Sequence, residues 1–276
     1  FLSYNLFVAK FQINSAVLDN TLASIGLINR NTVIAKIIKN SDNLGINILC
    51  RGHHVKVYYK NLFSSQRNTV ISDETGFCIC LTEHFLAACS LLGISNLTVE
   101  LSDPEFPFDD GSVYFWLNFL KNNIVINPNF FSERISLKKP LKIFDSNDKS
   151  RFIEMIPDEN FSVSYNLDIK TPPINQSFTW TLGDDIDSFA RARTFSSEAE
   201  NKMLGLDGWI LGYHETGFSK ELHYPNELSA HKALDLIGDL MLSGLNPLSI
   251  NMKLISNKAG HELNARAAQV LAEVFA

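Results

Sequence analysis

Hydrophobic and polar positions follow the same order twice along this chain. Short β-rich runs come first, at 32–39 and 45–50 and again at 174–182. A strongly apolar stretch bounded by helix-capping residues comes late in each block, over 82–93 and 229–244. Residues 121–140 bring Asn, Pro and Lys together between the blocks, which is typical of a linker. The pattern therefore predicts two parts with one plan.

The helix expected over 82–93 is apolar on nearly every face, which predicts that it is buried. Thr82 is expected to cap its N-terminus through the hydroxyl, and Gly93 to end it. Glu83 and His84 lie in its first turn, where charge is unusual for a buried helix. The helix dipole there disfavours a protonated imidazole, which suits His84 to bind a metal.

The helix expected over 229–244, with Ser229 as N-cap and Gly244 as its end, carries a polar stripe. His231, Asp235 and Asp239 recur every four residues and so share one face. On an otherwise apolar helix such a stripe must be paired, solvated in a cleft or bound to metal. A surface stripe or a simple His–Asp ion pair explains the same residues, so the pattern leaves these interpretations open.

A third helix, amphipathic, is expected behind Gly260, and His261 stands at its start. A lone His at a helix N-terminus is more often structural or exposed than functional. The sequence also lacks a Gly-rich phosphate loop and a GxGxxG turn, which argues against a nucleotide cofactor.

Composition excludes several classes of protein. The chain has 276 residues, of which 45% are hydrophobic and 20% charged, enough for a sizeable core. Its net charge of -6 argues against binding nucleic acid, because such proteins carry a basic face. No apolar run reaches the ~18 residues that a membrane span needs. The first ten residues lack the pattern of a signal peptide.

The four cysteines are Cys50, Cys78, Cys80 and Cys89, and they lack the CxxC spacing of a thiolate zinc site. Buried free thiols in a reducing compartment are the expected state, which predicts a cytoplasmic protein.

Five motifs in fixed order carry a resemblance to a known family. They are TEHFLAACSLLGISNLTVEL (82–101), PEFPFDDGS (104–112), ARTF (192–195), HKALDLIGD (231–239) and KAGHELN (258–264). Together they resemble the zinc deacetylases of lipid A biosynthesis, the UDP-3-O-acyl-N-acetylglucosamine deacetylases (LpxC family). The match runs from about Leu18 to the end of the chain, with weaker agreement at SIGL (24–27) and NFSVSYNLDI (160–169).

The resemblance implies an α+β fold of two similar domains, each a two-layer sandwich of a β-sheet packed on helices. The active site is expected between them. We place the first domain at 1–127, with Glu83 and His84, and the second at 128–276, with His231, Asp235 and His261. A monomer is expected.

The resemblance also implies the metal site and its base. His84, His231 and Asp235 match the family's zinc ligands, with iron(II) as the alternative metal in the cell. Two His and one carboxylate leave a fourth position open, as in catalytic rather than structural zinc sites. Glu83 matches the general base that takes the proton of the attacking water.

Further roles carry over to residues that match the same motifs. Thr194 is expected to stabilise the oxyanion. His261 matches the general acid, with Asp239 raising its pKa, and Lys232 is the next candidate for that role. Substrate binding is assigned to Phe195, Lys232 and Lys258. For Asp110, Gly111 and Ser112 we prefer a structural role.

Two stretches depart from the family pattern. Ile28, Asn29 and Arg30 stand where the family has a His after its opening Gly-Leu. The segment between Thr194 and His231 is shorter than the family's insert, which forms a passage for the acyl chain; LG at 211–212 is all that remains of its Gly-rich turn. Small residues are replaced there by Tyr213, His214 and Glu215.

These observations favour deacetylation of UDP-3-O-acyl-N-acetylglucosamine, a UDP-linked acylated amino sugar. The altered segment supports a second reading, the same zinc chemistry on another N-acyl substrate. A third is a catalytically silent relative with a binding or regulatory role. Loss of a motif residue would favour the third reading, and none of Glu83, His84, His231, Asp235 and His261 is lost.

Overall fold

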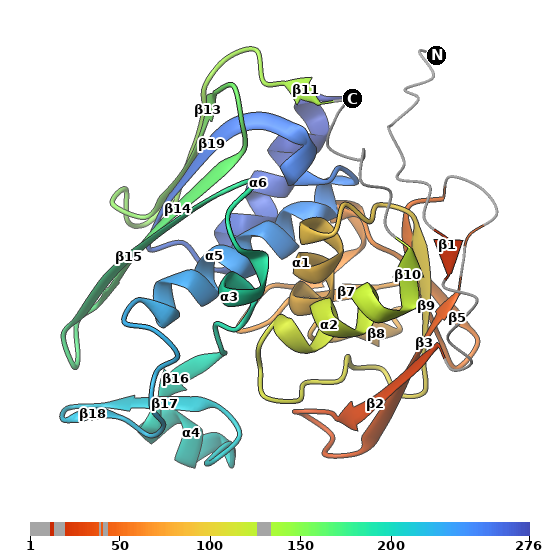
Figure 1. The fold of residues 1–276 in the computed structure, drawn as a ribbon, viewed down its shortest axis with the longest axis horizontal. Helices are drawn as coiled ribbons and strands as arrows, with labels where there is room; N and C mark the ends of the chain where they lie inside the picture. Colours follow the sequence, from red (N-terminus) through yellow and green to blue (C-terminus); the bar gives the residue numbers. More distant parts are fainter. Residues whose placement is uncertain (1–11, 14–19, 39, 41–43, 126–133) are drawn as a thin grey trace.

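The computed structural model describes residues 12–13, 20–38, 40, 44–125 and 134–276. Two mixed β-sheets lie on either side of a layer of helices (Figure 1). The interpretation of the first ten residues lies outside the described part of the chain, as does Leu18.

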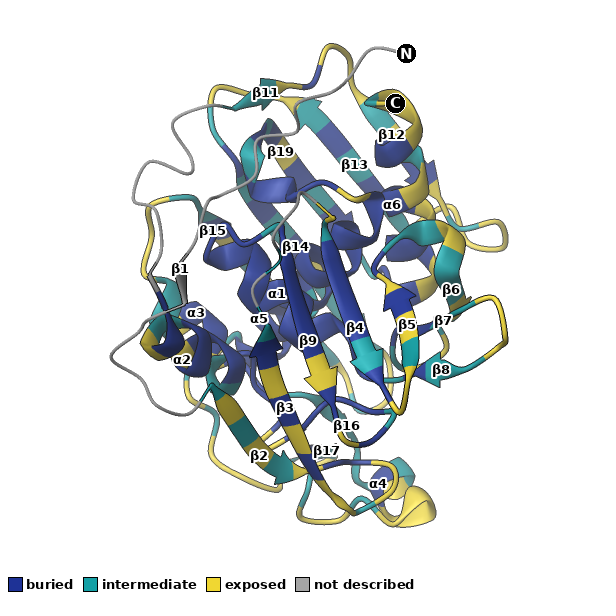
Figure 2. Cartoon of the chain, turned by 90° about the vertical axis from the view of Figure 1, so that its right-hand side faces the viewer, coloured by how far each residue is buried: buried dark blue, intermediate teal, exposed yellow. Residues whose placement is uncertain are grey.

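The first sheet has the strand order β2–β3–β9–β4–β5. Its strands are β2 (Thr21–Ile25), β3 (Thr32–Ile38), β4 (Ile46–Cys50), β5 (His53–Lys56) and β9 (Leu97–Leu101). The central β9 runs antiparallel to β3 and parallel to β4. Burial alternates along β3, as the period of a strand requires. Figure 2 shows β4 and β9 mostly buried, with exposed positions gathered toward the β2 edge.

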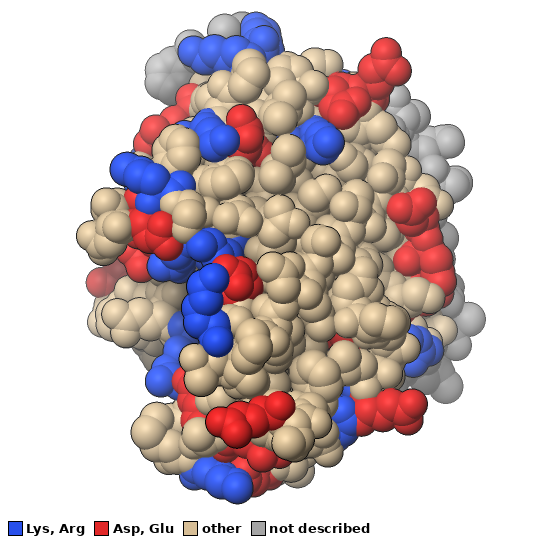
Figure 3. Space-filling view, turned by 90° about the vertical axis from the view of Figure 1, so that its left-hand side faces the viewer, with Lys and Arg blue, Asp and Glu red and all other residues tan. Residues whose placement is uncertain are grey.

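The second sheet repeats this plan in the order β12–β13–β19–β14–β15. Its strands are β12 (Leu141–Phe144), β13 (Phe152–Pro157), β14 (Ser162–Ile169), β15 (Ile174–Thr181) and β19 (Ile250–Asn257), with β11 (Ile135–Ser136) beside β19. Here β19 is central, antiparallel to β13 and parallel to β14. Figure 3 shows the face that includes this sheet, with charged side chains grouped left of the centre and along the border and a mostly uncharged area right of the centre.

Helices occupy equivalent places in both parts. One precedes each central strand and one follows it. They are α1 (Glu83–Leu91), α2 (Tyr114–Asn123), α5 (Glu227–Leu240) and α6 (His261–Val274). Helices α1 and α5 pack on each other in the middle of the molecule (Figure 1). The predicted α+β fold of two similar sheet-and-helix parts is confirmed.

Each part has one insert. It lies between the fourth strand of the large sheet and the helix that precedes the central strand, α1 or α5. The first insert, residues 59–79, holds a 3-10 turn η1 (Tyr59–Asn61), β6 (Leu62–Ser64), β7 (Val70–Ser72) and β8 (Cys78–Ile79). The second insert, residues 186–218, holds α3 (Ile186–Ala190), β16 (Phe195–Ser197), α4 (Glu198–Leu204), β17 (Leu211–His214) and β18 (Gly217–Phe218). In Figure 1 the strands β16–β18 and α4 of the second insert lie away from both large sheets, at the lower left.

The domain boundary predicted between residues 127 and 128 falls within 126–133, outside the described residues. We propose the division there because β10 (Ile124–Val125) pairs with β1 (Gln12–Ile13), whereas β11 joins the second sheet. No helix of the described residues is long and apolar enough to cross a membrane.

Two helix caps differ from the sequence prediction. Thr82 does stand before α1, but its hydroxyl donates to the carbonyl oxygen of Thr69 at 3.2 Å instead of capping the helix. Ser229 was predicted to be the N-cap of α5, and this is wrong: the helix begins at Glu227 with Asn226 before it. The Ser229 hydroxyl donates to Asn226 O at 3.1 Å. Gly93 and Gly244 have positive φ of 71° and 79°, as helix-ending glycines do.

The cysteine prediction holds in part. All four thiols are free, and Cys50 and Cys89 are buried. Cys78 and Cys80 are partly exposed, so the expectation of burial is wrong for these two. Cys78 begins the short strand β8, and Cys80 follows that strand.

Candidate active site

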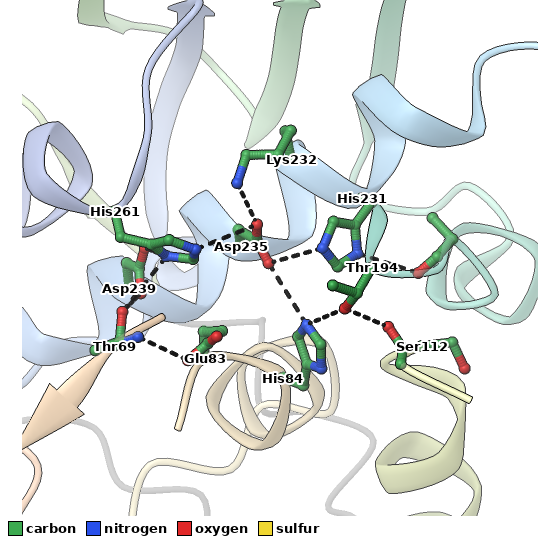
Figure 4. Close-up of polar contacts among 12 residues, drawn as sticks. Thr69, Glu83, His84, Ser112, Thr194, His231, Lys232, Asp235, Asp239 and His261 are labelled. Carbon is green, nitrogen blue, oxygen red and sulfur yellow. Dashed lines mark hydrogen bonds and ion pairs between the residues drawn. The ribbon is translucent and has the colours of Figure 1, made fainter. Parts of the chain in front are cut away.

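Three potential metal ligands converge where α1 meets α5. His84 comes from the first turn of α1, and His231 and Asp235 lie one turn apart on α5 (Figure 4). One ligand atom from each lies within 4.8 Å of the others, and all three residues are buried. The two parts of the fold therefore each contribute to one cluster.

The chemistry of these atoms fits a divalent metal. Asp235 Oδ1 is buried without a hydrogen-bond partner among the described residues, and lies 3.4 Å from His231 Nε2 and 3.6 Å from His84 Nε2. An orphaned buried carboxylate oxygen is costly unless a cation binds it. His231 Nδ1 faces Ala192 O at 3.3 Å, which leaves Nε2 free as a ligand. Burial lowers the pKa of His231 to about 3, so its ring is neutral.

The close contact between α1 and α5 depends on Gly238. A Cβ at this position would lie 2.1 Å from Glu83 O and 3.1 Å from Ala87 N. Only glycine lets the first turn of α1 approach this face of α5. That approach places His84 opposite His231 and Asp235.

Glu83 lies beside the cluster. Its Oε2 accepts a hydrogen bond from the backbone N–H of Thr69 at 3.0 Å. Burial raises the pKa of the Glu83 carboxyl. A carboxylate that is held by one donor and raised in pKa is suited to accept a proton.

His261 forms the other flank of the cluster, at the first residue of α6. Its Nδ1 lies 2.8 Å from Asp239 Oδ2. Burial lowers the pKa of His261, but the Asp239 and Asp235 carboxylates together outweigh burial and raise it to about 9. Asp239 also accepts from Asn264 Nδ2 at 2.8 Å and from the Thr69 hydroxyl at 2.5 Å. The His that was unremarkable by its sequence position thus lies buried beside a carboxylate that favours its protonated form.

Thr194 lies against His84, with its Oγ1 3.4 Å from His84 Nε2. The hydroxyl donates to Gly111 O at 2.9 Å, and the Thr194 backbone N–H donates to the same oxygen at 2.8 Å. Gly111 has a φ of +79°, and a Cβ there would lie 2.7 Å from the Phe108 ring. The DGS turn thus seats Thr194, in agreement with its expected structural role. To reach an oxyanion, the hydroxyl must leave Gly111.

The residues expected to bind substrate are only partly free to do so. Lys232 Nζ is bonded to Asp235 Oδ2 at 2.6 Å. Lys258 Nζ donates to Ser150 Oγ at 2.6 Å. The Phe195 ring stands edge-on to His231 with centroids 5.8 Å apart. All three line one cavity with the cluster.

This cavity has a volume of about 730 Å³, a size typical of small-molecule sites. One end holds the cluster with Glu83 and His261. The turn between β2 and β3 and the second insert give the cavity an apolar lining, which we call the apolar arm: Leu27, Ile28, Leu204, Leu206, Ile210 and Tyr213. Of the bulky substitutions noted in the sequence, Tyr213 lines the arm, whereas His214 ends β17, Glu215 follows it, and neither lines the cavity.

Two groups that hold the site in place were not predicted from the sequence. Thr69 connects Glu83 to Asp239, but it lies in a polar loop without a recognisable pattern. Arg193 forms a buried ion pair with Glu227, at 2.7 Å between Nε and Oε1, and its backbone N–H donates to the same oxygen at 3.1 Å. This pair fixes the segment before β16 that carries Thr194. The ARTF motif contained a signal for it, because a charged residue beside buried ones needs a partner.

A buried cluster of two histidines and one carboxylate, held between two similar sheet-and-helix parts, is typical of metal-dependent hydrolases. The family model described as "LpxC: UDP-3-O-acyl N-acetylglycosamine deacetylase" matches residues 17–273. The chain belongs to this family, and it is a deacetylase.

Relatives from distant bacteria agree. An enzyme of Pseudoalteromonas atlantica is 30% identical over 218 residues, which cover 74% of this chain and 70% of the relative. One of Syntrophus aciditrophicus is 29% identical over 273 residues, covering 92% and 84%. One of Leptospira biflexa is 29% identical over 230 residues, covering 79% and 74%. Each of these relatives carries the name UDP-3-O-acyl-N-acetylglucosamine deacetylase.

Proposed function

We propose that this chain hydrolyses the N-acetyl group of UDP-3-O-acyl-N-acetylglucosamine, a step of lipid A biosynthesis, to give acetate and the free amine. The observation that carries the proposal is the orphaned Asp235 Oδ1 between two histidines, in a cavity that also holds Glu83 and His261. His84, His231 and Asp235 would hold zinc, with iron(II) as the alternative. When bound, such a metal polarises an amide carbonyl and lowers the pKa of water toward ~7.

Glu83 acts as the general base in this proposal. Its carboxylate takes a proton from the attacking water, and the N–H of Thr69 fixes its orientation without occupying its second oxygen. Because Glu83 precedes His84 directly in α1, the base stays close to the cluster but outside it.

His261 acts as the general acid. Its Nδ1 is held by Asp239, so Nε2 is the nitrogen that delivers a proton to the leaving amine. The Thr194 hydroxyl stabilises the oxyanion after it turns away from Gly111. Lys232 forms an ion pair with Asp235 and offsets the charge of its carboxylate, and Lys232 is the alternative acid.

The cavity separates the two ends of the substrate. The acyl chain is assigned to the apolar arm, and Phe195 and Lys258 to the sugar and its diphosphate. The free thiols of Cys50, Cys78, Cys80 and Cys89 fit a reducing compartment, and we place the enzyme in the cytoplasm.

The test is release of acetate from the UDP-sugar substrate, before and after treatment with a chelator. Activity lost with the metal and restored by zinc or iron(II) supports the proposal. Turnover of a different N-acyl sugar, with none of this one, would favour the second reading made from the sequence. Protein that holds no metal at all would favour a silent relative.

A further inference from the structure

The two inserts and the turn between β2 and β3 meet over the apolar arm. Arg67 of the first insert forms an ion pair with Glu200, near the start of α4. Arg30 of the turn donates from Nη2 to Gly205 O, at the end of α4, at 2.8 Å. Helix α4 is therefore held at both ends by arginines from the first part of the fold.

Arg30 makes the more extensive of these contacts. Its guanidinium carbon lies 4.1 Å from the centroid of the Trp209 ring, a cation–π contact. Its Nη1 is buried and finds no hydrogen-bond partner in the described part of the chain. Both arginines line the cavity together with Glu200 and Gly205.

The turn presents Arg30 in a fixed position. The fully buried Glu105 carboxylate accepts the backbone N–H groups of Ile28 and Asn29 at 2.9 Å and 2.8 Å. A Cβ on Gly26 would lie 2.2 Å from the same carboxylate. Arg30 itself has a φ of +58°. The Arg30 side chain thus projects from a loop that is held in place by hydrogen bonds to Glu105.

We propose that Arg30, assisted by Arg67, is a latch that closes the apolar arm and sets the longest acyl chain that the enzyme accepts. A methylene group gains free energy only while it moves from water into apolar surroundings. A chain that reaches the Arg30 guanidinium meets a charge that burial penalises, so further methylenes add nothing. This inference rests on the proposed function, because it assigns the arm to an acyl chain.

The experiment measures the binding of free saturated fatty acids of graded length by calorimetry, with zinc-loaded protein. The wild type should bind about fourfold tighter for each added CH₂, the equivalent of about 0.8 kcal/mol, up to a plateau length. Arg30→Ala should move the plateau to longer acids. Arg67→Ala should move it less, because an exposed ion pair contributes little alone.

Lys142 provides a matched control. It forms an ion pair with Glu154 at 2.9 Å and lies 4.1 Å from the centroid of the Phe152 ring, but it does not line the cavity. Lys142→Ala should keep the wild-type plateau. The charge-reversed pair Arg67→Glu with Glu200→Arg should restore the plateau that Arg67→Ala shifts.

An Arg30→Ala plateau equal to that of the wild type would overturn the latch. A uniform loss of affinity for acids of every length would also overturn it, because Arg30 would then support the cavity lining without limiting chain length. If Arg30→Ala does not fold, Arg30→Gln keeps a donor for Gly205 and loses the charge over Trp209. Fatty-acid binding does not require turnover. A failure to release acetate would therefore refute the proposed reaction, and the dependence of binding on acid length could still be measured.

Discussion

At the scale of single residues, the site divides its tasks among atoms of the same side chain. Asp235 offers Oδ1 to the cluster and gives Oδ2 to Lys232. Thr69 uses its backbone N–H for Glu83 and its hydroxyl for Asp239. A conservative substitution can therefore remove one task and preserve the other.

Glu83→Gln should retain the metal and lose most activity. The amide keeps the size of the side chain and a carbonyl oxygen for the Thr69 N–H, but it cannot take a proton from water. A positioned base typically contributes about 10²–10⁴-fold to the rate, so kcat should fall by that range. Elemental analysis is the companion measurement. If the variant loses its metal, Glu83 is a ligand and the proposed roles are wrong.

Asp239→Asn should move the basic limb of the kcat/KM profile to lower pH. His261 must be protonated to serve as an acid, so activity falls as pH rises through its pKa. Burial lowers that pKa and the Asp239 and Asp235 carboxylates together raise it to about 9, so removing the charge of Asp239 lowers it. The comparison is the pH profile of wild type and variant, both metal-loaded. A basic limb at the same pH in both would assign the acid to another residue, with Lys232 next.

At the scale of elements, the site is defined by how closely two helices approach. The α1–α5 contact brings a His from one motif to a His and an Asp from another. Gly238 permits this contact, and the Arg193–Glu227 pair holds the segment before β16 against the start of α5.

Gly238→Ala should destabilise the protein and weaken metal binding together. The new methyl group meets backbone atoms of Glu83, which cannot turn aside as a side chain could. Overpacking of this kind costs about 1–3 kcal/mol or more, and it moves His84 away from α5. Urea unfolding and metal titration measure the two effects. Ser229→Ala on the same helix adds no atom at this contact and should leave metal affinity unchanged. If Gly238→Ala binds the metal with wild-type affinity, the cluster tolerates a larger distance between α1 and α5.

The elements themselves were largely predictable from the sequence. Period-two burial in β3 and the apolar residues of α1 are properties of the local pattern, and the structure confirms both. The helix N-caps were less predictable, because the hydroxyls of Thr82 and Ser229 donate to tertiary or local carbonyl groups instead of accepting from free helix N–H groups. The Thr69 and Arg67 contacts depend on where two inserts fold, which local periodicity does not encode.

At the scale of the whole molecule, a metal at this cluster would join the two parts of the fold. Ligands from α1 and α5 bind the ion only when both parts are folded against each other. Removing the metal should therefore lower the unfolding temperature of the whole chain. At a free metal concentration about a thousand times its Kd, metal binding adds about 4 kcal/mol to the free energy of unfolding.

Calorimetry with and without chelator measures this effect. His84→Ala removes the one ligand from the first part, so its unfolding temperature should respond little to added zinc. Equal stability of the metal-free and metal-loaded wild type would show that the parts associate without help from the ion.

The placement of the inserts has a consequence for how this enzyme can change over generations. Both leave the repeated plan at the same point, so both emerge on the side of the molecule where α1 and α5 present the reactive groups. Mutation can lengthen, shorten or reshape either one while the strands of the repeated plan keep their pairing. Natural selection can thus act on substrate range separately from chemistry. In this chain Arg30 and Arg67 contact the second insert, so changes confined to surface loops could reshape the arm and leave the reactive groups in place.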